Sequence, residues 1–300
     1  MRVLLTGGTG FIGEALTAAL LASGSEVTIL SRQVQGDRNH CRFVRSLDEI
    51  AASEQLDAVI NLAGASLAAR RWTAAYKHEI VTSRMNVTRA VLALLARLQQ
   101  PPAVLLSASA IGYYGHHGDE CLTEFSAITP GFAQTLCNDW EALALQAQEL
   151  GVRVCLLRLG VVLDAGGGAL VEMTKSFRFG VASWLGSGHQ WLSWVHREDV
   201  VRALQFLLGR DELCGPFNVT SPAPVTGRDF ARALQAHHRT LIQAGVPAPV
   251  MRLLVGEMAG ELLLNGQRVL PDHLQAAGFT FTYPDIESAL ETIYTTNQGR

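Results

Sequence analysis

The stretch that decides the fold is the amino terminus, Met1-Arg2-Val3-Leu4-Leu5-Thr6-Gly7-Gly8-Thr9-Gly10-Phe11-Ile12-Gly13. An apolar run predicts a buried strand, and an apolar helical pattern begins after the glycines. Gly7 would allow a tight turn, Gly10 would let the backbone approach a pyrophosphate, and Gly13 would let the helix pack against the sheet. The anion would lie at the N-H groups that open the helix. The alternative is a purely structural glycine turn. The predicted dinucleotide contacts in this stretch are Thr6, Gly7, Gly10, Phe11, Ile12 and Gly13.

Short apolar runs and helical patterns alternate through the first two thirds of the chain. Strands are expected over residues 2–5, 26–30, 58–62, 103–107 and 152–158, and helices over residues 11–23, 83–99 and 132–150. This alternation predicts an α/β fold with a doubly wound parallel sheet, the NAD(P)-binding Rossmann fold. Right-handed crossovers would bring the carboxyl ends of the strands to one edge, where a ligand should bind.

The alternation of predicted strands and helices becomes less regular after residue 160. Residues 165–169 are expected to form a flexible loop or turn, and the aromatic stretch 177–194 could be a lid or part of a core. We predict that residues 1–165 with 195–220 form the nucleotide-binding domain. Residues 166–194 and 221–300 would then form a smaller C-terminal, substrate-side domain.

The composition indicates a soluble globular protein. Of 300 residues, 48% are hydrophobic and 17% charged, which excludes a disordered or coiled-coil chain. Lys and Arg total 24 against 27 Asp and Glu, so we expect no nucleic-acid partner. No apolar run reaches the about 18 to 20 residues of a membrane helix, so we expect no membrane partner.

Cysteine usage and the amino terminus indicate the cytoplasm. The five cysteines lie far apart, without a Cys-x-x-Cys pair, which is typical of reduced thiols. The chain begins directly with an apolar strand and leaves no room for an export leader. The run His116-His117-Gly118-Asp119-Glu120 is contiguous in an expected loop, so no metal site is predicted.

The end of the second expected strand predicts which dinucleotide binds. Ser31 and Arg32 stand where an NAD-selective site would present a carboxylate to the ribose 2′-hydroxyl. An arginine and a hydroxyl can instead bind a 2′-phosphate. We therefore predict NADP(H) as the cofactor, the alternative being that Arg32 is a solvated surface residue.

Further motifs carry a resemblance to a known family. They are Asn61-Leu62-Ala63-Gly64, residues 107–115 (SASAIGYYG), residues 256–271, and residues 278–284. With the glycine motif, they resemble the extended short-chain dehydrogenase/reductase superfamily. The likeness is to an atypical branch, the NAD-dependent epimerase/dehydratase family with a C-terminal domain of unknown function.

The resemblance implies cofactor contacts beyond the glycine turn. These contacts are Ser31, Arg32, Leu62, Ala63, Gly64, Glu79 and Arg84. From the residues alone, Glu79 and Arg84 would be an acid and a base on a helix surface, and residues 61–64 a polar turn after a strand.

The expected catalytic residues match the resemblance only in part. In typical relatives a serine orients the substrate carbonyl, and a tyrosine four residues before a lysine exchanges a proton. Ser109 matches the serine, but Cys137 and Glu141 stand at the tyrosine and lysine positions. Cys137 could be a poor proton donor or a buried structural thiol. Glu141 could accept a ribose hydroxyl, and its charge would raise the pKa of a neighbouring acid. Tyr113 or Tyr114 could replace the missing acid, or pack as aromatics.

These observations predict an NADP(H)-dependent oxidoreductase or epimerase-like protein. Its substrate would be a small carbonyl or sugar-like molecule, and a homo-oligomer is compatible with its apolar helices. The alternative is an NADPH-binding sensor or interaction protein without turnover, with a role in cell division among the options that the resemblance offers.

Overall fold

A seven-stranded sheet forms the centre of the computed structural model, which describes residues 1–33 and 35–297. Its strand order is β12-β7-β5-β4-β1-β2-β3, and every neighbouring pair is parallel. This confirms the predicted doubly wound parallel sheet. The strands are β1 (Arg2–Thr6), β2 (Glu26–Leu30), β3 (Cys41–Val44), β4 (Ala58–Asn61), β5 (Val104–Ala110), β7 (Arg153–Leu159) and β12 (Gly215–Val219).

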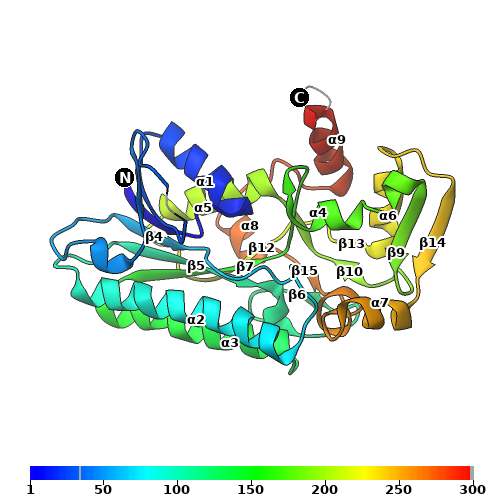
Figure 1. The fold of residues 1–300 in the computed structure, drawn as a ribbon, viewed down its shortest axis with the longest axis horizontal. Helices are drawn as coiled ribbons and strands as arrows, with labels where there is room; N and C mark the ends of the chain where they lie inside the picture. Colours follow the sequence, from blue (N-terminus) through cyan, green and yellow to red (C-terminus); the bar gives the residue numbers. More distant parts are fainter. Residues whose placement is uncertain (34, 298–300) are drawn as a thin grey trace.

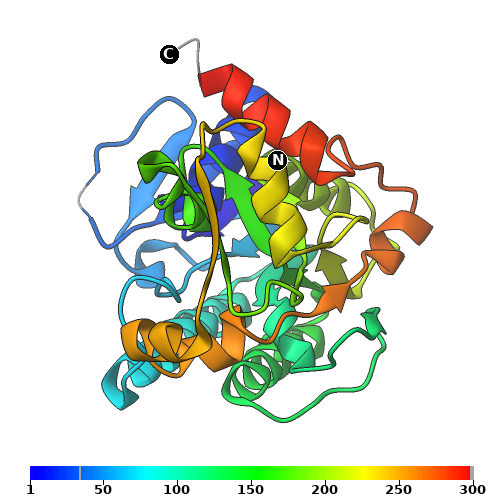
Figure 2. The same ribbon diagram turned by 90° about the vertical axis from the view of Figure 1, so that its right-hand side faces the viewer.

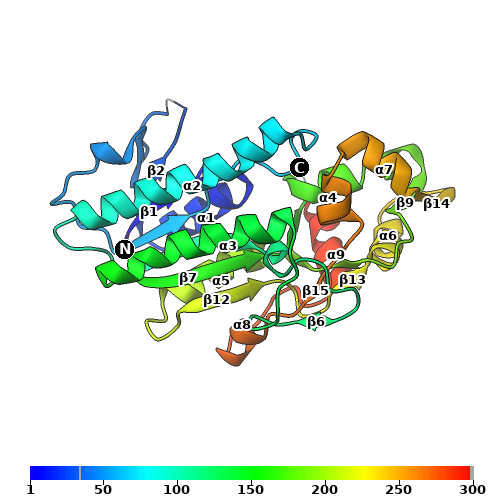
Figure 3. The ribbon, with the colours of Figure 1, turned by 90° about the horizontal axis from the view of Figure 1, so that it is seen from below.

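Helices cover both faces of this sheet (Figures 1 and 3). On one face lie α1 (Phe11–Ala22) and α5 (Arg197–Leu208), and on the other lie α2 (Ala74–Arg97) and α3 (Phe132–Leu145). Successive residues of a strand point to opposite faces, so Val3 and Leu5 pack with the first pair and Leu4 packs with the second. The strands are therefore largely apolar, as expected for a sheet buried on both sides.

A smaller lobe lies beyond the carboxyl ends of the strands (Figures 1 and 2). Its strand pairs are β8 (Val161–Asp164) with β11 (Trp194–His196), β9 (Val181–Leu185) with β14 (Ile242–Val246), β10 (Trp191–Leu192) with β13 (Val225–Thr226), and β6 (Cys121–Leu122) with β15 (Arg268–Val269). Its helices are α4 (Gly168–Met173), α6 (Gly227–Gln235), α7 (Ala248–Val255) and α9 (Ile286–Asn297). The short helix α8 (Asp272–Ala276) instead packs against β12 of the central sheet (Figure 3).

Short helical turns connect these elements. The 3-10 turns are η1 (Leu47–Glu49), η2 (Ile111–Tyr114), η3 (Gln146–Leu150) and η4 (Phe177–Phe179), and η5 (Ala259–Leu263) is a π-helical turn. The turn η2 matters most for function, because it leads from the end of β5 toward the start of α3.

The aromatic stretch 177–194 belongs largely to the core of the lobe. Phe177 and Trp194 are fully buried, and the Trp194 indole N-H donates to the Ala223 carbonyl at 3.0 Å. Of the flexible loop or turn expected at residues 165–169, the structure has the turn, because Asp164 bridges to Gly167 and Leu163 to Gly168. This turn joins β8 to α4 and lies against Phe11, next to the glycine motif.

A buried carboxylate joins the lobe to the nucleotide-binding part. Asp199, fully buried at the start of α5, accepts the backbone N-H groups of Thr282 and Tyr283, each at 2.9 Å. It also pairs with Arg202 at 2.7 Å. Within the described part of the chain, no helix has the length and apolar character needed to cross a membrane.

Candidate cofactor and substrate site

The glycine turn between β1 and α1 has the geometry that the sequence predicted. Gly7 has a φ of +75°, which a glycine adopts without strain. A Cβ at Gly13 would lie 2.1 Å from the Gly7 carbonyl oxygen, so only glycine permits this approach of helix and turn. Gly10 is exposed and begins α1 without a side chain of its own. The first N-H groups of α1, at Phe11 and Ile12, are thus open to an anion.

Phe11 is held in place by the start of α5 and by the glycine-rich turn of the lobe. The Arg197 guanidinium lies 4.9 Å from the centre of the Phe11 ring and donates to the Phe11 carbonyl at 3.3 Å. Arg197 also pairs with Asp164 at 2.5 Å. A Cβ at Gly168 would come within 2.7 Å of the Phe11 ring, so the glycine-rich turn packs against the start of α1.

The ends of β1 and β4 meet beside the glycine turn. The buried Thr6 hydroxyl donates to Asn61 at 2.6 Å and accepts the Ala63 N-H at 3.3 Å. A Cβ at Gly7 would lie 2.8 Å from the Leu62 carbonyl carbon. Leu62 and Ala63 therefore lie against the glycine turn, where they would border the expected cofactor groove.

Ser31 and Arg32 follow β2 at the same edge of the sheet. Ser31 is buried, and its hydroxyl accepts the Gln33 N-H at 3.2 Å. Arg32 is exposed and forms no ion pair with any carboxylate in the described ranges. Its guanidinium is therefore available to a ligand at the end of β2.

Glu79 and Arg84, both on α2, differ in their environments. Glu79 is exposed and pairs with Arg70 at 3.3 Å. Arg84, by contrast, is only 9% exposed, donates to the Ile80 carbonyl, and lies 5.3 Å from the Trp140 ring. The prediction of a base on the helix surface is thus wrong for Arg84, because the face of α2 that carries Arg84 is turned toward α3.

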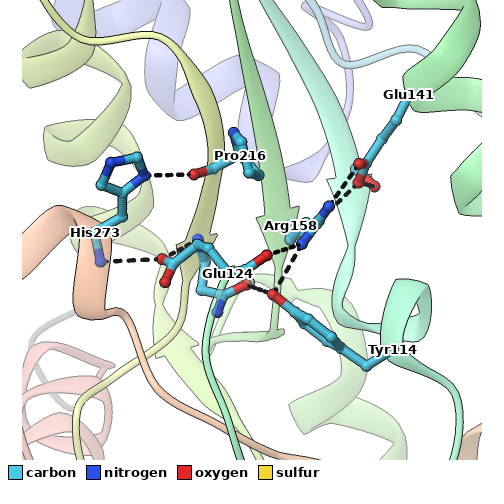
Figure 4. A network of polar contacts seen from close by, with 8 residues as sticks. Tyr114, Glu124, Glu141, Arg158, Pro216 and His273 are labelled. Atoms are coloured by element: carbon cyan, nitrogen blue, oxygen red, sulfur yellow. Dashed lines mark hydrogen bonds and ion pairs between the residues drawn. The ribbon is translucent and has the colours of Figure 1, made fainter. Parts of the chain in front are cut away.

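The predicted catalytic residues Ser109 and Glu141 contact each other. Ser109, at the end of β5, donates its hydroxyl to Glu141 of α3 at 2.6 Å. The same carboxylate accepts two hydrogen bonds from Arg158 of β7, at 2.9 Å and 2.8 Å (Figure 4). All three side chains are buried. The ribose contact suggested for Glu141 would therefore have to come from a carboxylate already engaged by protein donors.

Arg158 is a permanent cation in this arrangement. Burial works against its charge, but the hydrogen bonds and charge of Glu141 outweigh burial and raise the pKa of Arg158 above its ordinary value. The Arg158 cation thus balances the negative charge of Glu141, and the Ser109 hydroxyl proton points toward the Glu141 carboxylate.

Tyr114 and Tyr113 differ in their exposure to solvent. Tyr114 is fully buried, donates to Asn218 at 2.6 Å and accepts from Arg158 at 3.1 Å (Figure 4). Burial raises the pKa of Tyr114 to about 12, so it holds its proton. Tyr113 is half-buried, and its ring centre lies 3.4 Å from the Arg158 guanidinium carbon. Of the two tyrosines, Tyr113 is the one within reach of a ligand.

A family model described as NAD dependent epimerase/dehydratase family matches residues 3–219. The chain belongs to this family. A second model, a domain of unknown function (DUF1731), matches residues 246–293 within the lobe. The resemblance that the sequence motifs indicated is therefore confirmed.

Relatives in this family match along nearly the whole chain. An epimerase family protein of Mycobacterium bovis is 40% identical over 290 residues, which is 96% of this chain and 96% of its own. An epimerase family protein of Staphylococcus aureus is 38% identical over 301 residues, which is 97% of this chain and 98% of its own.

Two solved structures that are similar to this chain contain a nicotinamide cofactor. A human epimerase family protein solved with NADPH is 33% identical, with a TM-score of 0.89 and coverage of 98% of this chain and 99% of that one. The UDP-glucose 4-epimerase of Thermus thermophilus, in complex with NAD, shares the fold at 20% identity and a TM-score of 0.77, covering 100% of this chain and 99% of that one.

Cys137, one helical turn before Glu141, is a protonated thiol in this family member. It is 4% exposed, and burial followed by the charge of Glu141 raises its pKa to about 11. Contacts with the Ala110 backbone and the Ser109 side chain, and the charge of Arg84, act in the opposite direction. Cys137 therefore carries no charge at neutral pH.

The DUF1731 segment contributes a residue that sequence reasoning missed. Glu261 accepts the Ala133 N-H at 3.2 Å and so caps α3, whose first residue follows a glycine. Beside it lies a cavity of about 490 Å³ lined by Gly256, Glu257, Gly260, Glu261 and Asn265. The lobe thus fixes the start of the helix that carries Cys137.

Arg158 was also missed, although a signal exists. Arg158 stands between Leu157 and Leu159 in a predicted strand, and an arginine buried there requires an acidic partner. In the part of the chain that the structure describes, no cluster of metal-ligating side chains is present.

Proposed function

We propose that the protein binds NADP(H) and acts as an oxidoreductase or epimerase-like enzyme on a small carbonyl or sugar-like substrate. The observation that carries the proposal is the glycine turn, where a Cβ at Gly13 would lie 2.1 Å from the Gly7 carbonyl and α1 begins openly at Gly10. Such a turn leaves room for a diphosphate against the helix N-H groups. When bound, the nicotinamide supplies hydride transfer.

The choice of NADP(H) over NAD(H) is supported by two observations. Arg32 is exposed and unpaired among the described carboxylates, and Ser31 precedes it at the end of β2. A human relative at 33% identity was solved with NADPH. A guanidinium suits a phosphate monoester, whereas a carboxylate at this point would favour the 2′-hydroxyl of NAD.

Different residues would have different roles at the nicotinamide end of the cofactor. Ser109 would orient the substrate oxygen from the end of β5. Tyr113 is the group proposed to exchange a proton, because it is half-buried, whereas Tyr114 is buried and engaged with Asn218 and Arg158, and the Cys137 thiol is also buried. Arg158 and Glu141 would hold Ser109 in position.

The test begins with cofactor binding. Calorimetric titration should detect NADPH, and absence of heat with both NADPH and NADH would contradict the proposal. The holoprotein is then screened against carbonyl compounds and nucleotide sugars for loss of nicotinamide absorbance, with a product assay for epimerisation. Tight binding without turnover on a broad panel would support the sensor or interaction protein instead. We also propose a cytoplasmic location and a small-molecule partner.

A further inference from the structure

Arg84 is a buried cation without an acidic partner in the described ranges. It is 9% exposed, and its hydrogen-bond acceptor is the uncharged Ile80 carbonyl at 3.0 Å. Burying a guanidinium in this way is unfavourable unless a ligand or solvent compensates for it. Burial accordingly lowers the pKa of Arg84.

The guanidinium of Arg84 lies along the groove. A Cβ at Gly64 would come within 2.9 Å of its central carbon, so Arg84 passes directly beneath the turn that follows β4. That turn also contains Ala63, which bonds to Thr6 of the cradle. On its other side Arg84 faces Trp140 of α3, the helix that also carries Cys137 and Glu141. Arg84 thus lies between the phosphate cradle and the catalytic candidates.

The groups around Arg84 bring no net negative charge. Glu141 is neutralised by Arg158, and Cys137 is protonated at neutral pH. The Tyr76 hydroxyl donates to the Ser66 carbonyl. The nearby acids on α2 and the lobe have their own cations: Glu79 pairs with Arg70, and Glu257 pairs with Lys77. One uncompensated positive charge therefore remains at this part of the groove.

We propose that Arg84 makes the groove select the reduced cofactor, NADPH, over the oxidised cofactor, NADP⁺. The inference rests on the proposed function. The oxidised nicotinamide ring carries a positive charge and the reduced ring carries none, whereas the phosphates are the same in both forms. A fixed cation in a poorly solvated groove repels only the oxidised ring. Contacts with the phosphates contribute equally to the binding of NADPH and of NADP⁺, so they do not change the ratio of the two dissociation constants.

The experiment measures the dissociation constants of NADPH and NADP⁺ by calorimetry on the full chain. For the wild-type protein we expect NADPH to bind about tenfold more tightly, equivalent to about 1.4 kcal/mol. Arg84→Met should bring the ratio close to one by strengthening NADP⁺ relative to NADPH. Arg84→Lys keeps the charge and should keep most of the ratio, which excludes a merely structural effect.

Two controls separate ring from phosphate effects. Arg32→Ala should weaken NADPH and NADP⁺ by the same factor and leave their ratio unchanged. The probe 2′-phospho-ADP-ribose lacks the ring, so Arg84→Met should leave its affinity unchanged.

The outcomes are distinct. A wild-type ratio of one or below overturns the inference whether or not the variants fold. Loss of both forms and of 2′-phospho-ADP-ribose in Arg84→Met also overturns it, because Arg84 would then be a phosphate contact. Failure of wild-type protein to bind either form contradicts the proposed function itself.

Discussion

Arg158 holds Glu141 by two hydrogen bonds, at 2.9 Å and 2.8 Å, with both side chains nearly inaccessible to solvent. The pair links β7 to α3 and receives the Ser109 hydroxyl on one of its oxygens. Arg158 also donates to the Tyr114 hydroxyl and to the Glu124 carbonyl (Figure 4). The Glu124 carboxylate in turn accepts the backbone N-H groups of Asn218 and of His273 on α8. An acid at this position is tolerated because a cation from the neighbouring strand cancels its charge.

Arg158→Met should therefore destabilise the protein strongly. It leaves the Glu141 carboxylate buried without a partner, and breaking such a pair costs about 3 to 5 kcal/mol. The free energy of unfolding from urea titration measures this loss. Replacing both residues, as Glu141→Leu with Arg158→Met, should cost less than Arg158→Met alone. The partly exposed pair Arg42 and Glu54 is the control, because Glu54→Ala should change stability by less than about 1 kcal/mol. A double variant that is less stable than Arg158→Met would refute this account.

Local patterns in the sequence predict the cradle but not this pair. The glycine turn depends on neighbouring residues and on a strand and helix that each show their own periodicity, so Gly7, Gly10 and Gly13 could be assigned in advance. Arg158 and Glu141 lie on different elements, and their contact depends on how α3 crosses the sheet. Arg84 was taken for a surface base for a related reason: its burial depends on which face of α2 meets α3, and polar neighbours along α2 hide that face.

Arg32→Ala tests the proposed choice of cofactor. The exposed guanidinium is expected to bind the 2′-phosphate, and a charge-assisted hydrogen bond contributes about 1.5 to 3 kcal/mol. The variant should therefore weaken NADPH binding by about tenfold to a hundredfold and hardly change NADH binding. Arg89→Ala, an exposed arginine on α2, is the matched control and should change neither. Equal losses for NADPH and NADH in the titration would show that Arg32 does not recognise the phosphate.

The buried thiols predict a loss of stability in alkaline solution. Burial raises the pKa of Cys137 and that of Cys155 to about 11, whereas an unfolded thiol ionises near its ordinary value of 9.0. Between these values the unfolded chain loses protons that the native protein keeps, so the free energy of unfolding falls as pH rises from about 9 to about 11. Below this window the thiols contribute no pH dependence. Each thiol accounts for a change on the order of 2 kcal/mol.

Urea unfolding under reducing conditions across this window measures the effect. Cys137→Ala should flatten the alkaline slope, whereas Cys121→Ala should leave it unchanged because Cys121 is exposed. An identical slope in the wild-type protein and in Cys137→Ala would mean that the thiol ionises equally well in the folded protein.

Gly13→Ala tests the cradle on which the proposed function depends. The added Cβ would lie 2.1 Å from the Gly7 carbonyl oxygen and 2.7 Å from the Gly8 Cα, both of them backbone atoms that cannot rotate away. Either α1 moves off the sheet or the turn opens, and overpacking of this kind costs about 1 to 3 kcal/mol. Since the same turn is proposed to hold the diphosphate, NADPH affinity should fall by at least about a hundredfold, or about 2.7 kcal/mol. Gly36→Ala is the control, because a Cβ there meets no atom within 4 Å and should change neither stability nor binding. If Gly13→Ala melts at a lower temperature yet binds NADPH as tightly as the wild-type protein, the turn is structural and the dinucleotide binds elsewhere.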